Sequence, residues 1–135
     1  MSKLHTLFAT DKTVEREGIM IEVAEGIRFR VRRAGGSNKR YGERLSALLK
    51  PHKRAVEMGT MDEAVARRLM VQAFVEACLI DWEGVTDADD KPLEFTTENA
   101  IALFLELPEL FDAVSAQAEK AANFRSLEAE DAAKN

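Results

Sequence analysis

The stretch from Thr60 to Ile80 constrains the fold most, because it combines a helix start signal with a long apolar run. Thr60 and Glu63 have the spacing of a capping box, in which the hydroxyl accepts from a helical N–H and the carboxylate reaches back. From Leu69 to Ile80, ten of twelve residues are apolar and cover nearly the whole circumference of a helix. We therefore predict a buried central helix over residues 60–81. The run is too short to span a bilayer, which needs about 20 apolar residues.

The length and the cysteine content limit the class of protein. A chain of 135 residues fits one domain with one core. The single cysteine, Cys78, excludes a disulfide framework and suits a reducing compartment. No segment has the charged start and apolar core of a signal peptide. We expect a cytoplasmic protein with no membrane partner.

A β-hairpin is predicted over residues 18–33. Apolar residues recur at every second position on both sides of a turn at Glu25 and Gly26. These apolar residues are Ile19, Ile21, Val23, Ile27, Phe29 and Val31. The same alternation places Arg28, Arg30 and Arg32 together on the opposite, solvated face.

The rest of the chain is predicted to be helical, so the fold class is mainly α, a small helical domain with an N-terminal β-hairpin. Besides the central helix, the expected helices span residues 37–50, 97–107 and 108–124. Together they make a single domain over residues 1–124, followed by a flexible tail over residues 125–135. The residues expected to anchor its core are Trp82, Phe95 and Phe104.

The charges are unevenly distributed along the chain. Residues 28–54 hold ten Lys or Arg and one Glu, a net charge of +9, so the rest carries −14 of the total of −5. Such a basic band indicates a nucleic-acid partner, an acidic protein partner or self-assembly. We predict a homo-oligomer with head-to-tail contacts. The residues expected to mediate it are Arg28, Arg30, Arg32 and Arg40.

The sequence contains no convincing catalytic, metal or cofactor motif. Residues 35–39 resemble a fragment of a phosphate loop but lack its spacing. Asp87, Asp89 and Glu98 have the spacing of calcium-loop ligands, but Pro92 replaces the turn glycine. His5, His52 and Cys78 form no local cluster. We therefore expect neither an enzyme nor a bound metal or cofactor.

The order of short motifs from Phe29 to Phe124 resembles the tail assembly chaperones of long, non-contractile-tailed bacteriophages. The first motifs are Phe29-Arg30-Val31, Gly36-Ser37-Asn38-Lys39-Arg40-Tyr41, Leu48-Leu49-Lys50-Pro51 and Arg67-Arg68. The later motifs are Asp81-Trp82-Glu83-Gly84-Val85, Asp89-Asp90-Lys91-Pro92-Leu93-Glu94-Phe95, Thr97-Glu98-Asn99-Ala100 and Leu107-Pro108-Glu109-Leu110. Asp90 stands where the family's D-G-K turn has glycine.

The resemblance implies a non-virion protein that acts in the host cytoplasm during tail morphogenesis. Such a chaperone coats the tape measure protein, keeps it soluble and recruits tail tube subunits, in many members through a frameshifted longer form. Two alternatives stay open. One is a small nucleic-acid-binding module that uses the basic band over residues 28–54, although we do not expect nucleic acid as the partner. The other is a non-catalytic structural subunit of a particle.

Overall fold

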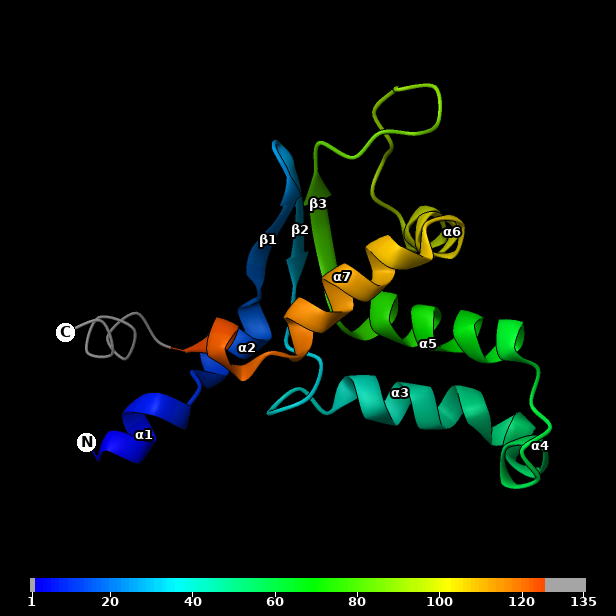
Figure 1. The fold of residues 1–135 in the computed structure, drawn as a ribbon, viewed down its shortest axis with the longest axis horizontal. Coiled ribbons are helices and arrows are strands. Elements are labelled where there is room, and N and C mark those ends of the chain that lie inside the picture. Colours follow the sequence, from blue (N-terminus) through cyan, green and yellow to red (C-terminus); the bar gives the residue numbers. More distant parts are fainter. Residues whose placement is uncertain (1, 126–135) are drawn as a thin grey trace.

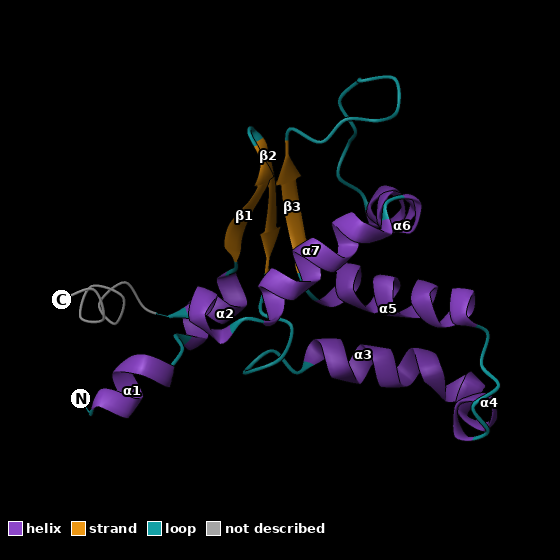
Figure 2. Ribbon diagram, in the orientation of Figure 1, coloured by secondary structure: helices purple, strands orange, loops and turns teal. Residues whose placement is uncertain are grey.

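The protein combines a three-stranded antiparallel sheet with helices, as a computed structural model describes it for residues 2–125 (Figures 1 and 2). Two short helices, α1 (Lys3–Phe8) and α2 (Lys12–Glu17), precede the strands β1 (Ile19–Ala24) and β2 (Ile27–Val31). The middle of the chain forms α3 (Arg40–Leu49), η1 (Lys50–His52), α4 (Lys53–Glu57), α5 (Glu63–Ala77) and β3 (Leu79–Glu83). The last elements are α6 (Thr97–Glu106), α7 (Pro108–Glu119) and η2 (Ala121–Phe124). Apart from Arg125, the tail predicted over residues 125–135 lies outside the described residues.

The prediction of a mainly α fold with one hairpin is wrong, because a third strand makes the protein mixed α and β. β1 and β2 form the expected antiparallel hairpin, and β3 adds to the free side of β2. In this pairing Trp82 lies opposite Phe29 and Asp81 lies opposite Arg30. The third strand also pairs the backbone groups that a hairpin leaves open on the β2 side.

The central helix is shorter than the prediction of residues 60–81. It starts after Asp62, whose side chain accepts from the backbone N–H groups of Ala64 and Val65, so this carboxylate caps the helix rather than Thr60. It ends at Ala77, and the predicted last turn is the start of β3. A short apolar run such as Leu79-Ile80 fits a buried strand as well as a helix, so periodicity alone could not separate them.

The other helices also differ at their ends from the predicted ranges. α3 begins at Arg40 rather than at residue 37, because Gly35 and Asn38 first form a tight turn. The helix predicted over residues 108–124 is interrupted at Lys120, where the backbone is extended, and continues as the 3-10 helix η2. α6 starts as predicted: the Thr96 hydroxyl accepts from the N–H of Asn99 at 3.0 Å.

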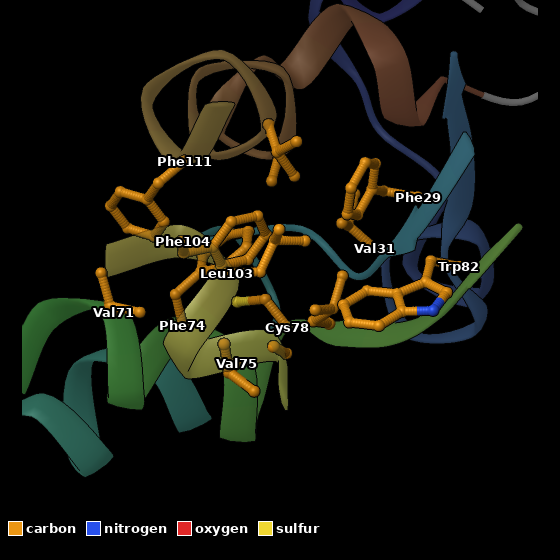
Figure 3. Packing of buried hydrophobic residues seen from close by; sticks show 14 of the residues in the cluster. Phe29, Val31, Val71, Phe74, Val75, Cys78, Trp82, Leu103, Phe104 and Phe111 are labelled. Carbon is orange, nitrogen blue, oxygen red and sulfur yellow. The ribbon is translucent and has the colours of Figure 1, made fainter. Parts of the chain in front are cut away.

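The core lies between the inner face of the sheet and the helices α5, α6 and α7 (Figure 3). Phe29 contributes from β2, Phe74 from α5 and Phe104 from α6, and all three are fully buried. Their rings pack at centroid distances of 5.9 and 6.3 Å around Phe104. α3 lies along α5, and this helix pair extends away from the foot of the sheet (Figure 1).

Candidate functional site

The structure places the predicted arginines in two different regions. Arg28 and Arg30 lie on the outer face of the sheet, as the alternation predicts, and Arg32 follows directly after β2. Arg40 is separate from them, because it is the exposed first residue of α3. The four arginines therefore do not form one continuous patch.

Acidic and carbonyl groups of the same chain already contact the sheet arginines. Arg28 lies 3.9 Å from a carboxylate oxygen of Glu22 and 3.5 Å from one of Glu83. The Nε atoms of Arg30 and Arg32 donate to the backbone carbonyls of Glu17 and Arg16. The outer sheet face is thus a mixed-charge surface rather than a basic one.

The segment that resembles a phosphate loop is a structural joint around Glu15. The Glu15 side chain is 2% exposed and accepts from Nη1 of Arg33 at 2.7 Å, from Thr10 at 2.9 Å and from Ser37 at 3.2 Å. A Cβ atom at Gly36 would overlap both Glu15 and Arg33, and Gly36 has a positive φ of 56°. The packing of the joint therefore requires glycine at this position.

The hydrogen bonds at this joint keep Glu15 ionised. Burial raises the pKa of the Glu15 carboxyl, but hydrogen bonds from Arg33, Thr10 and Ser37 and the charge of Arg33 outweigh it. The net result is a pKa below the ordinary value. The buried Asn38 completes the joint, because its Nδ2 donates to the carbonyls of Arg33 and Ala77 at 2.9 and 3.3 Å.

Cys78 and Asp87, the candidates for catalysis and for metal binding, have structural roles in the fold. Cys78 is fully buried, and burial raises the pKa of its thiol to about 12, which leaves it un-ionised and unreactive near neutral pH. Asp87 uses Oδ1 to accept from the backbone N–H groups of Asp89 and Lys91, so it caps a turn. Among residues 2–125, no three His, Cys, Asp or Glu side chains gather as metal ligands.

The predicted anchors belong to one aromatic cluster. Trp82 is 7% exposed, and its indole N–H donates to the carbonyl of Leu93 at 2.9 Å. Its ring packs edge-on against Phe29 and Phe95 at centroid distances of 6.0 and 5.0 Å. Phe104 is fully buried, whereas Phe95 is half-buried at the rim of this cluster. Trp82 thereby fixes the segment between β3 and α6 on the core.

The structure also exposes an apolar surface that the sequence patterns did not predict. It lies where α3, α4 and the start of α5 meet, at the end of the helix pair that is farthest from the sheet (Figure 1). We call it the tip surface and define it by Leu49, Val56, Met61 and Met70. Val56 is 48% exposed and Met70 43%. The prediction of a buried central helix therefore fails at Met70, which belongs to the apolar run but is exposed.

The shape and composition of the tip surface suit an apolar ligand. Two shallow grooves of about 540 and 350 Å³ meet at Leu49 and Val56. Lys50, Lys53 and Glu57 line the larger groove, and Lys53 lies 4.0 Å from a carboxylate oxygen of Glu57, so the apolar floor has a border of mixed charge. Methionine side chains are flexible and polarisable, which lets such a surface adapt to differently shaped apolar partners. Two of the five methionines, Met61 and Met70, line the smaller groove, and both fall within the predicted central helix, a signal that could have indicated this surface from the sequence.

Comparison with known proteins shows the family of the chain. No curated protein and no solved structure matches it significantly. Within the part that the structure describes, no helix is long and apolar enough to cross a membrane. A family model described as YdaY prophage protein matches residues 36–135, a range that includes the tip surface and the joint residues Gly36 to Asn38. The chain therefore belongs to the YdaY prophage protein family and is phage-derived.

Proposed function

We propose that this prophage protein is a tail assembly chaperone that binds the tape measure protein, keeps it soluble and helps to recruit tail tube subunits. The prophage family places the chain in a phage context. The motif order described above supports the finer assignment. The chaperone would act in the host cytoplasm, without catalysis, and would be absent from the mature virion.

The observation that carries this proposal is the exposed tip surface. A holdase for a long helical protein needs apolar surface that is open in the folded state. An amphipathic helix binds such a groove through residues spaced at i, i+3, i+4 and i+7. Each contact is weak, but many copies bound along one long chain add their affinities through the shared partner. We expect Val56 and Met70 to contact the apolar stripe of the tape measure helix.

Co-purification of the tape measure protein encoded by the same prophage tests the proposal. Both proteins are expressed together, and the tagged chaperone is captured from the soluble fraction. Val56→Asp is expected to reduce the captured and the soluble tape measure protein at least tenfold, because it places a charge where the two apolar grooves meet. Leu4→Asp is the matched control, since Leu4 is 68% exposed and lies on α1, away from the tip surface.

The outcomes distinguish binding at the tip surface from nonspecific hydrophobic binding. Loss of capture with Val56→Asp and retention with Leu4→Asp support the proposal. Equal capture by both variants rejects the tip surface as the binding site. If the unaltered protein leaves the tape measure protein insoluble and uncaptured, the chaperone function itself is rejected. A pull-down of tail tube protein by a longer form of the chain tests the recruitment step separately.

A further inference from the structure

One edge of the sheet is open. β1 pairs with β2 alone among the described residues, and Figure 2 shows it on the side of the sheet away from β3. In an antiparallel strand at an edge, about half of the backbone N–H and C=O groups point away from the sheet. Such an edge is a template for another strand.

A groove runs along this edge and exposes part of the apolar row of β1. It has a volume of about 540 Å³ and is bounded by residues 19–23 of β1 and by Ala113 and Gln117 of α7. Ile19, Ile21 and Val23 point towards the core but are only half-buried, because α7 covers them incompletely. The groove therefore offers both unpaired backbone and uncovered apolar side chains.

The opposite edge of the sheet, formed by β3, is protected against pairing with another strand. A second strand is therefore expected to add at β1 rather than at β3. β3 carries Asp81 and Glu83, and charges on an edge strand discourage further pairing. The carboxylate of Asp81 also accepts from the N–H of Trp82 at 2.8 Å. β1 has a single charged residue, Glu22, which already forms an ion pair with Arg28.

We propose that β1 pairs antiparallel with β1 of a second copy, so that the two sheets join across a two-fold axis at Ile21. The strand is self-complementary in this register. Ile19 lies opposite Val23 of the partner subunit, and both belong to the apolar row that faces the groove. On the outer face, Met20 lies opposite Glu22 of the partner subunit, so no like charges are directly opposed. This inference is independent of the proposed chaperone function.

The register predicts different effects for two substitutions at one exposed position. Met20 is 39% exposed on the outer face, so either a Glu or a Lys fits there without disturbing the core. Met20→Glu places two carboxylates opposite each other twice per dimer and weakens association roughly tenfold. Met20→Lys also lies opposite Arg30 of its own chain, but it places an ammonium opposite Glu22 of the partner subunit, which offsets that repulsion and maintains association. Leu4→Glu, on the exposed helix α1 and away from both sheet edges, is the control and leaves association unchanged.

Sedimentation equilibrium of the full chain over a wide concentration range tests the proposal. The expected result is a monomer–dimer equilibrium that Met20→Glu shifts towards monomer and Met20→Lys does not, with unchanged circular dichroism spectra for both. A protein that stays monomeric at the highest concentration overturns the proposal. A dimer that responds equally to both substitutions, or to neither, also overturns it, because the contact then does not involve this register.

Discussion

The joint around Glu15 yields the sharpest prediction for stability. Glu15→Gln keeps the side-chain volume but removes the charge that Arg33 faces at 2.7 Å. Breaking a buried ion pair by neutralising one partner costs about 3–5 kcal/mol, since the other charge is left without compensation. Arg33 keeps 18% of its side chain exposed and can regain some hydration, so we expect about 2–3 kcal/mol in this protein.

Urea unfolding followed by circular dichroism at neutral pH measures this loss. Glu17→Gln is the control, because Glu17 lies on the same helix α2 but is exposed. Its substitution should change the free energy of unfolding by less than about 0.5 kcal/mol. Equal effects of the two substitutions would refute the argument that the buried pair stabilises the joint.

The pH dependence gives a second, independent measurement on the same pair. The pKa of Glu15 is lower in the folded protein than the unfolded value of about 4.3. The ionised carboxylate therefore stabilises the fold fully above that unfolded pKa, and this contribution is lost as the pH falls through the folded pKa. The stability difference between the unaltered protein and Glu15→Gln should be constant above about pH 5 and narrow below about pH 4. A difference that stays constant down to pH 3 would contradict this assignment.

Three further predictions concern other parts of the structure. Trp82→Ala should cost about 3–5 kcal/mol by urea unfolding, because it leaves a cavity beside Phe29; an unchanged melting temperature would count against this packing. Asp90 has a positive φ of 60°, which glycine adopts easily and a β-branched residue does not. Asp90→Gly should therefore leave the free energy of unfolding unchanged or raise it, whereas Asp90→Val should lower it by about 1–2 kcal/mol. Equal effects would argue against the left-handed turn. Arg40→Glu should weaken any head-to-tail association more than Arg28→Glu, as light scattering at low salt can measure, because Arg28 already contacts carboxylates of its own chain.

Sequence patterns that extend over only a few residues predicted the hairpin and the first turns of α6 and α7. The hairpin could be predicted because apolar residues recur at every second position on both sides of Gly26. The start of α6 at Thr96 and the place of Pro108 in the first turn of α7 follow from chemistry within a few residues. Such signals depend on neighbours in the sequence, so no tertiary information is needed to interpret them.

The third strand could not be predicted because its conformation depends on a distant partner. Leu79 and Ile80 continue the apolar run of α5, and only pairing with β2 makes the extended conformation favourable. The change of direction also depends on Gly84, where a Cβ atom would overlap the carbonyl oxygen of Gly26 in the hairpin turn. Both contacts join segments that are more than 45 residues apart, and no local pattern contains that information.

The basic band, residues 28–54, is less basic in the folded protein than in the sequence, because acidic residues from outside the band lie beside its arginines. Glu15 and Glu22, which precede the band, and Glu76 and Glu83, which follow it, all form ion pairs with arginines of the band. This neutralisation weakens the main reason to consider a nucleic-acid partner or an arginine-driven assembly, because both required a basic surface in the folded protein. The open edge of β1 does not depend on that charge. Association through β1 should therefore persist at salt concentrations that screen contacts between exposed charges, and this difference separates the two modes of assembly.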